Sequence, residues 1–339
     1  MVDKVFITGA SGFIAQHIVK LFISNGYYVI GTVRSADKGE KLKANLKSNN
    51  FKYEIVPDIT AEGAFNEALK SNPNIKYLLH TASPFTYDTT DPEHDLIIPA
   101  IKGTENILNS VYEFQPSIEK VVITSSDAAI YSADDEQNSS LSFNEQSWND
   151  ISYRDSLKNA VSAYYGAKSF AEKLSWKFLE EKKPNFKLIS VNPVYVFGPQ
   201  AFLNEVKPTL NVSNELIHNL IKIGPNDSFD NDKGGFIDVR DVAKAHLYAI
   251  EKEELIGKRV FMTNGHFSVQ MMLDIINEKF PQLKSKIPTG TPGSGPTDIK
   301  TLATVDNTQT RNLLKFEFIS LDKIVTDTIQ QVYDAKAKL

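Results

Sequence analysis

The stretch "KVFITGASGFIA", residues 4–15, decides the fold of this 339-residue chain. Its first half is an apolar strand, and its second half is a glycine turn that leads into an amphipathic segment from Ile14 to Ser24. Gly9 permits the tight turn, and Gly12 lets the backbone approach a pyrophosphate. The amides at the start of the following helix then point at the phosphates. A glycine turn in this position therefore favours dinucleotide binding over a merely structural turn.

Strand and helix patterns alternate from this turn as far as about residue 200. The expected strands are residues 4–9, 27–34, 53–58, 76–82, 120–126 and 186–193, and the expected helices are residues 14–24, 36–46, 61–70, 94–114 and 161–181. The strands are apolar on both faces, which is typical of a parallel sheet covered by helices on both sides. We expect an α/β fold, a Rossmann-type doubly wound parallel sheet with a smaller C-terminal substrate lobe.

The alternation ends after Pro193, where shorter strands and helices begin. We expect residues 1–195, with part of 236–262, to form the Rossmann domain. The substrate-binding lobe is expected at about 196–235 and 263–339. Two segments rich in turn-forming residues, 132–140 and 288–296, are expected to be mobile loops.

The composition narrows the class of protein. Hydrophobic residues make up 41% and charged residues 23%, as in ordinary globular domains. The net charge is -5 and no basic block stands out, so nucleic acid is not an expected partner. The chain has no cysteine, which excludes disulfides and thiol nucleophiles. Its six histidines show no metal-ligand spacing, and we expect no metal.

The sequence also lacks the features of a membrane protein. Met1 is followed almost directly by the first strand, with no leader pattern, and no apolar run approaches the ~20 residues of a membrane span. We expect a soluble, cytoplasmic monomer or homodimer whose partner is a small molecule.

The end of the second strand indicates which dinucleotide is bound. A site for NAD usually has an acid there for the ribose hydroxyls, but this strand ends in Arg34, and Lys38 follows one helical turn later. A guanidinium and an ammonium would bind a 2′-phosphate. A solvated surface arginine is the alternative for Arg34. Asp58, after the third strand, could bind the adenine amino group or cap the next helix. We expect NADP(H) rather than NAD(H).

The segment "SAYYGAK", residues 162–168, holds a candidate acid–base pair. On a helix, Tyr164 and Lys168 lie four residues apart on the same side, at the edge of the apolar stripe that faces the sheet. Tyr165 is expected almost opposite that stripe, facing solvent or another subunit. A tyrosine near pKa 10 needs a neighbouring cation to act as an acid at neutral pH. The alternative is a surface pair on an amphipathic helix.

Six motifs together resemble the extended short-chain dehydrogenase/reductases: "TGASGFIA", "HTASPF", "VVITSS", "AYYGAK", "VNPVYVFGPQ" and "FIDVRDVAKAH". The chain is most similar to the dihydroflavonol-reductase-like branch and, within it, to the yeast-type NADPH-dependent methylglyoxal and ketone (carbonyl) reductases. The resemblance covers nearly the whole chain. It implies NADPH-dependent reduction of aldehydes, diketones, ketoesters and bulky ketones.

The resemblance also implies roles for individual residues. Ser126 would be the catalytic serine, Tyr164 the proton donor and Lys168 its activator. The residues expected to bind the cofactor are Gly9, Ser11, Gly12, Phe13, Ile14, Arg34, Lys38, Asp58, Ile59, Thr81, Ala82, Ser83, Thr124, Tyr164, Lys168, Pro193 and Val196. The expected substrate residues are Phe85, Ser126, Tyr131, Val161 and Tyr195, for each of which core packing is the alternative.

Two residues depart from the family pattern. Asp127 stands where an aromatic or apolar residue is more usual, so we expect a more polar pocket wall. Tyr165 replaces a small residue. Two other functions remain open: a nucleotide-sugar epimerase or dehydratase that retains NAD, and a non-catalytic NADP(H) sensor.

Overall fold

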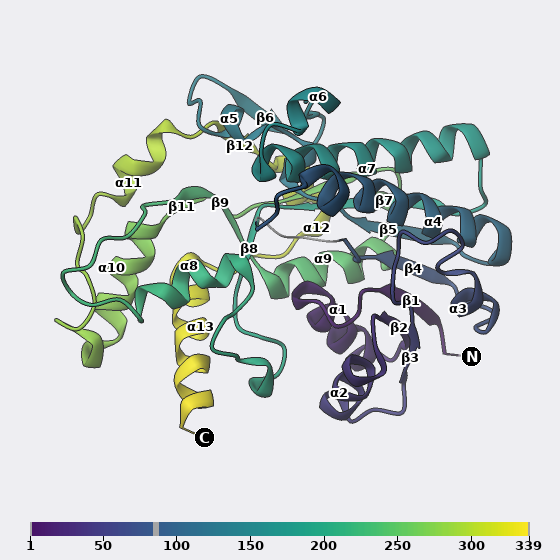
Figure 1. Ribbon diagram of the computed structural model, residues 1–339, viewed down its shortest axis with the longest axis horizontal. Coiled ribbons are helices and arrows are strands. Elements are labelled where there is room, and N and C mark those ends of the chain that lie inside the picture. Colours follow the sequence, from purple (N-terminus) through teal and green to yellow (C-terminus); the bar gives the residue numbers. More distant parts are fainter. Residues whose placement is uncertain (1, 84–87, 338–339) are drawn as a thin grey trace.

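A seven-stranded parallel sheet runs through the larger part of the molecule (Figure 1). The computed structural model describes residues 2–83 and 88–337. The strand order is β10-β7-β5-β4-β1-β2-β3, and every neighbouring pair is parallel. The strands are β1 (Lys4–Thr8), β2 (Tyr28–Val33), β3 (Phe51–Ile55), β4 (Tyr77–His80), β5 (Lys120–Thr124), β7 (Lys187–Pro193) and β10 (Arg259–Met262). The expected Rossmann-type fold is confirmed.

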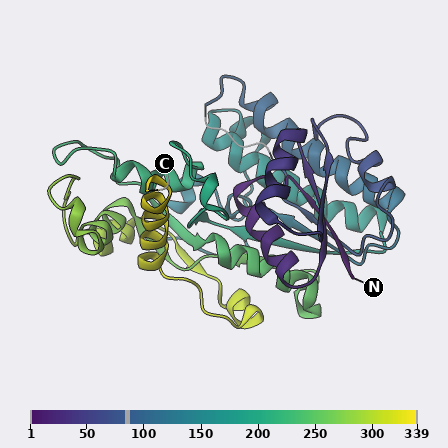
Figure 2. The ribbon, with the colours of Figure 1, turned by 90° about the horizontal axis from the view of Figure 1, so that it is seen from below.

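Side chains of each strand alternate between two buried layers, because successive residues point to opposite faces. Val5 and Ile7 of β1 lie in one hydrophobic cluster and Phe6 in the other. Helices cover both faces (Figures 1 and 2). The first layer contains α1 (Phe13–Ser24) and α9 (Val239–Glu251), the second contains α3 (Asn66–Lys70), α4 (Ile98–Phe114) and α7 (Ala160–Lys182), and α2 (Ala36–Leu46) packs beside β3.

The chain reverses its winding direction between β1 and β4, and ligands of doubly wound sheets bind at such a point. The two strand ends are joined there by side chain–backbone bonds. Thr8 Oγ1 accepts hydrogen bonds from the amides of Thr81 and Ala82, at 3.1 and 3.0 Å. These hydrogen bonds hold the ends of β1 and β4 together at the point where a ligand would bind.

A smaller lobe lies beyond the carboxyl ends of the strands, on the left in Figure 1. It has its own core, in which Phe197 contacts Phe267 with ring centroids 5.0 Å apart. Its elements are β8 (Tyr195–Phe197), α8 (Val212–Leu220), β9 (Lys233–Asp238), β11 (His266–Ser268), α10 (Val269–Lys279), α11 (Gly295–Asp298) and α13 (Leu321–Lys336). The remaining elements are α5 (Ala133–Glu136), β6 (Ser142–Asn144), α6 (Tyr153–Ser156), β12 (Thr304–Asp306) and α12 (Thr308–Leu314), with β6 and β12 paired in parallel.

Three segments differ from the sequence-based expectation. The helix expected at 61–70 begins only at Asn66, because Gly63 has a φ of 66°, in the left-handed region. The expected loop at 132–140 contains α5, whose first turn is stabilised by a capping box between Ser132 and Asp135. Part of the other expected loop forms the start of α11.

Candidate active site

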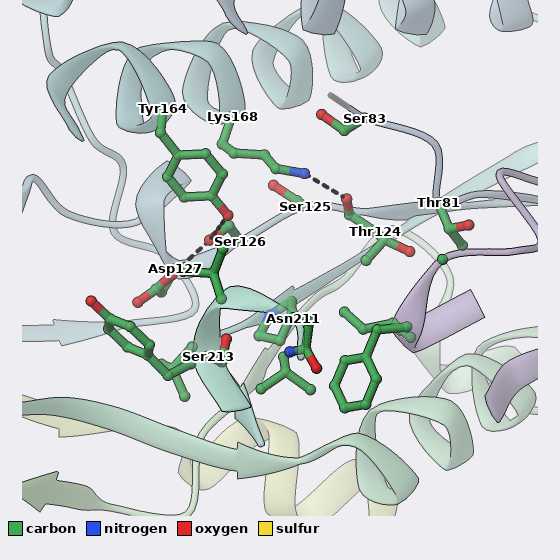
Figure 3. Close-up of a pocket in the computed structure, with 18 of the residues that line it drawn as sticks. Thr81, Ser83, Thr124, Ser125, Ser126, Asp127, Tyr164, Lys168, Asn211 and Ser213 are labelled. Atoms are coloured by element: carbon green, nitrogen blue, oxygen red, sulfur yellow. Dashed lines mark hydrogen bonds between the residues drawn. The ribbon is translucent and has the colours of Figure 1, made fainter. Parts of the chain in front are cut away.

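A cavity of about 340 Å³ opens at the carboxyl ends of the strands, between the sheet and the smaller lobe. Figure 3 shows side chains from both parts pointing into it. Its walls are formed by Gly9, Gly12, Phe13, Ile14, Ala15, Thr81, Ser83, Thr124, Ser125, Ser126, Asp127, Tyr164, Tyr165, Lys168, Pro193, Val194, Tyr195, Val196, Asn211, Val212 and Ser213.

The glycine turn forms one end of this cavity and leaves little room for side chains. Gly9 has a φ of 66°, and a Cβ placed on it would lie 3.0 Å from the Cα of Ala82. A Cβ on Gly12 would lie 3.3 Å from the carbonyl oxygen of Gly9. Gly12 is the N-cap of α1, and no side chain there accepts a hydrogen bond from the first amides of the helix. These amides lie at the wall of the cavity. This cradle fits the diphosphate of a dinucleotide.

The tyrosine, the serine and the lysine meet at the middle of the cavity (Figure 3). The Tyr164 hydroxyl donates a hydrogen bond to Ser126 Oγ at 3.3 Å. Lys168 Nζ, one turn further along α7, donates to the carbonyl oxygen of Thr124 at 3.4 Å. Burial lowers the pKa of Lys168 to about 8, against the opposing effect of the Glu172 charge. The site therefore holds a phenol, a hydroxyl and an amine of shifted pKa within one small volume.

Glu172 fixes α7 against the sheet. Its carboxylate is 1% exposed and accepts hydrogen bonds from Ser125 Oγ at 2.5 Å and from Asn192 Nδ2 at 2.6 Å. Arg259, on β10, donates to the same carboxylate at 2.6 Å. Asn192 also donates to the carbonyl oxygen of Ser126, at 3.0 Å. The strand end that carries Ser126 and the helix that carries Tyr164 are thus held by one buried network.

Asp127 follows Ser126 and is buried, with 6% of its surface exposed. Its Oδ1 lies 2.6 Å from Ser126 Oγ and accepts the Ala128 amide at 2.9 Å, while its Oδ2 accepts the Tyr131 hydroxyl at 2.8 Å. Burial raises the pKa of the Asp127 carboxyl, although the hydrogen bonds from Ser126 and Tyr131 act in the opposite direction. Because Asp127 lines the cavity, its wall is polar at this point.

The structure brings most of the expected site residues together. Those that line the cavity are Gly9, Gly12, Phe13, Ile14, Thr81, Ser83, Thr124, Ser126, Tyr164, Lys168, Pro193, Tyr195 and Val196. Other expected residues that the structure describes lie outside its walls: Ser11, Arg34, Lys38, Asp58, Ile59, Ala82, Tyr131 and Val161. Phe85 lies outside the described residues.

Arg34 and Asp58 follow the ends of the neighbouring strands β2 and β3. Arg34 is exposed just before α2, and Lys38 is exposed in the first turn of α2. Hydrogen bonds from Thr60 lower the pKa of Asp58, and the charge of Arg34 lowers it further. Arg34 and Asp58 therefore lie within electrostatic reach of one another.

Two of the expected substrate residues lie in other surroundings. Tyr131 is buried in the core and hydrogen-bonds Asp127, and Val161 is 41% exposed near the start of α7. The expectation that Tyr165 faces solvent or another subunit is wrong. Its side chain is 7% exposed, and its hydroxyl donates to Glu136 Oε2 at 3.5 Å. The segment after Ser126 packs over that side of α7, so the helix is buried on two faces.

Sequence reasoning missed the wall contributed by Asn211, Val212 and Ser213, which lies across the cavity from Tyr164 (Figure 3). No local pattern links these residues to the site. Tertiary packing of the smaller lobe alone places them there.

Among residues 2–83 and 88–337, no group of three or more His, Asp or Glu side chains could hold a metal ion. No helix in those ranges is long and apolar enough to cross a membrane.

A family model, the NAD dependent epimerase/dehydratase family, matches residues 5–262. The chain belongs to this family. The resemblance to extended short-chain dehydrogenase/reductases is therefore confirmed. Within the family, the chain is 48% identical over 333 residues to a putative NADPH-dependent methylglyoxal reductase of Candida albicans, with 97% of this chain and 98% of the relative covered. It is 47% identical over 341 residues to the NADPH-dependent methylglyoxal reductase of Saccharomyces cerevisiae, with 99% and 100% covered.

Solved structures of the family agree with this placement. The crystal structure of yeast methylglyoxal/isovaleraldehyde reductase complexed with NADPH has a TM-score of 0.96 and 46% identity, and covers 99% of this chain and 100% of that one. A reductase from Candida albicans in complex with NADPH has a TM-score of 0.95 and 46% identity, with 98% and 99% covered.

Proposed function

We propose that this protein is an NADPH-dependent carbonyl reductase that converts aldehydes and ketones to alcohols. The observation that carries the proposal is the hydrogen bond from Tyr164 to Ser126, with Lys168 one turn away, in a cavity that continues into the glycine turn. Two relatives that share nearly the whole chain are named as an NADPH-dependent methylglyoxal reductase and a putative one, which supports the same cofactor and reaction class here.

The cradle around Gly9 and Gly12 would hold the diphosphate of the cofactor, and Arg34 with Lys38 would bind the 2′-phosphate. Lys168, together with Pro193 and Val196, would hold the nicotinamide riboside half. Bound NADPH supplies the hydride. The side chains of the protein would bind the substrate oxygen and supply the proton.

Ser126 and Tyr164 would both hydrogen-bond the substrate oxygen, since their oxygens lie 3.3 Å apart. Tyr164 then transfers its phenolic proton to that oxygen as negative charge develops on it. The Lys168 ammonium stabilises the phenolate that remains. Tyr195, with Asn211, Val212 and Ser213 from the smaller lobe, would contact the rest of the substrate. Methylglyoxal, isovaleraldehyde, diketones and ketoesters are the proposed substrates.

The test is NADPH consumption with methylglyoxal and isovaleraldehyde, compared with NADH, for wild type and Tyr164→Phe. We expect Tyr164→Phe to retain NADPH binding and lose turnover by about a hundredfold or more. Tyr112→Phe is the matched control, because Tyr112 is exposed on α4 and does not line the cavity. Wild-type turnover in Tyr164→Phe would exclude the mechanism. Purified protein that carries NAD would instead favour an epimerase, and binding without turnover over a broad panel would favour a sensor.

The domain division also belongs to this proposal. Residues 1–195 with part of 236–262 would form the cofactor domain, and about 196–235 with 263–339 the substrate lobe. A cytoplasmic location and a monomeric or homodimeric state are tested by imaging a fluorescent fusion and by light scattering after size exclusion.

A further inference from the structure

The carboxyl of Asp127 and the hydroxyl of Ser126 share one proton position. The Oδ1–Oγ distance is 2.6 Å, so a hydrogen lies between these two oxygens. If the carboxyl is ionised, it can only accept, and Ser126 must donate its single hydrogen to Asp127. If the carboxyl is neutral, Asp127 can donate to Ser126 Oγ, and the serine hydrogen is released toward the cavity.

We propose that Asp127 is a positioning residue that controls the hydrogen of Ser126: the neutral carboxyl leaves it available to the substrate oxygen, and the carboxylate withholds it. This inference rests on the proposed function, in which Ser126 donates to that oxygen. The protons balance without any co-reactant, because one hydrogen rotates about the Ser126 Cβ–Oγ bond and one moves onto or off Asp127. Raising the pH therefore turns the Ser126 hydrogen away from the substrate oxygen and toward the Asp127 carboxylate, so that Ser126 can then only accept a hydrogen bond from the cavity.

The surroundings of Asp127 supply the bias toward the neutral form. The carboxyl is buried, and burial raises its pKa. Burial and the charge of Asp127 raise the pKa of Glu136 to about 8, and this repulsion acts on both carboxyls. The titratable and charged groups on the elements packed around Asp127 are Tyr131, Glu136, Tyr164, Tyr165, Lys168, Glu172 and Arg259.

Neither cation in that group offsets the repulsion by direct pairing. Arg259 is paired with the Glu172 carboxylate at 2.6 Å. Lys168 Nζ donates to the Thr124 carbonyl oxygen. The Ala128 amide and the Tyr131 hydroxyl donate to the carboxyl oxygens and favour the carboxylate, so they oppose the effect of burial on the pKa of Asp127. The Ala128 amide also donates to Ser126 Oγ at 3.2 Å. The control of Ser126 depends on a single proton.

The experiment measures how many fold Ser126→Ala lowers kcat/KM. This cost of Ser126→Ala is the kcat/KM of the enzyme with Ser126 divided by that of the enzyme carrying Ser126→Ala, in the same background. The experiment uses the full chain with NADPH and methylglyoxal, from about pH 6 to about pH 9. In the wild-type background we expect a cost of about tenfold or more at low pH that shrinks toward one as pH rises. The second background is the double variant Asp127→Leu with Tyr131→Phe, which removes the acid and the phenol that would otherwise lose its partner. There we expect the cost to stay large at every pH.

A ratio of two variants in one background cancels general effects of the substitutions on folding and cofactor binding. An equal cost of Ser126→Ala at every pH in both backgrounds would overturn the control by Asp127. Asp127→Asn is the conservative variant if the double variant does not fold, and its Ser126→Ala cost must also be independent of pH. Tyr164→Phe in parallel separates the two proposals. If it abolishes turnover while the cost of Ser126→Ala does not change with pH, only the role of Asp127 fails.

Discussion

The carboxylate of Glu172 lies 2.6 Å from Arg259, four residues along α7 from Lys168. Both partners are buried, and Arg259 also lies over the Trp148 ring, 3.8 Å from its centroid. We expect Glu172→Ala to lower the free energy of unfolding by about 3 to 5 kcal/mol, because the guanidinium is left buried and uncompensated. Urea unfolding checks this, with the exposed Glu180→Ala on the same helix as control. Equal stability of the two variants would contradict it.

Lys168 is predicted to destabilise the protein when the cofactor is absent. Its folded-state pKa of about 8 lies below the usual lysine value of 10.5, so the unfolded chain binds more protons between those values and stability rises with pH across that window. Lys168→Met should therefore stabilise the apoprotein by on the order of 2 kcal/mol near pH 7. The advantage should shrink above about pH 8, in contrast to the exposed Lys177→Met, which should show neither effect. Urea unfolding at the two pH values is the measurement.

Glu136 should make stability fall as pH rises. Its folded-state pKa is raised to about 8 from 4.5, so the native chain holds a proton that the unfolded chain has lost. We expect Glu136→Gln to remove on the order of 3 kcal/mol of the decline in unfolding free energy between about pH 5 and pH 8. The amide can still accept from the Gly235 amide, which lies 3.2 Å away in the wild type. An unchanged slope in denaturant unfolding across this range would count against the buried acid.

Arg34 is predicted to select NADPH over NADH. Arg34→Ala removes the guanidinium proposed for the 2′-phosphate, so the KM for NADPH should rise about tenfold or more while that for NADH stays the same. Lys43→Ala is the matched control, since Lys43 is exposed in the last turn of α2, about 10 Å along the helix axis from its start. Steady-state kinetics with both cofactors decide the matter. A similar change in both KM values would show that Arg34 does not recognise the phosphate.

Much of the Rossmann domain could be predicted because its information is local. The apolar run in residues 4–8 and the turn at Gly9 are properties of adjacent residues. The helix expected at 36–46 is observed with the same bounds as α2. Helical spacing likewise makes Tyr164 and Lys168 a candidate pair on one side of α7, whereas their proposed roles come from the family resemblance. The seventh strand, β10, is not among the expected strands, although it lies within residues 236–262, part of which is expected in the Rossmann domain.

The environment of α7 could not be read from its sequence. A helical stripe shows which face meets the sheet, but the second buried face at Tyr165 depends on the segment after Ser126 folding back over the helix. Two acids and two phenols meet there from separate stretches of chain. Long-range packing likewise places Asn211 in the cavity wall.

The pair between Glu172 and Arg259 also has a consequence for biosynthesis. The two residues are separated by 87 positions in the chain, and β10 joins the sheet only after the strands β8 and β9 have been made. A nascent chain therefore carries the Glu172 carboxylate on α7 before its arginine has been translated. Until then the acid has neutral donors, namely Ser125, Asn192 and Trp176. The first six strands of the large sheet can come together on the ribosome, whereas the tyrosine helix α7 gains its final anchor only when β10 has been made.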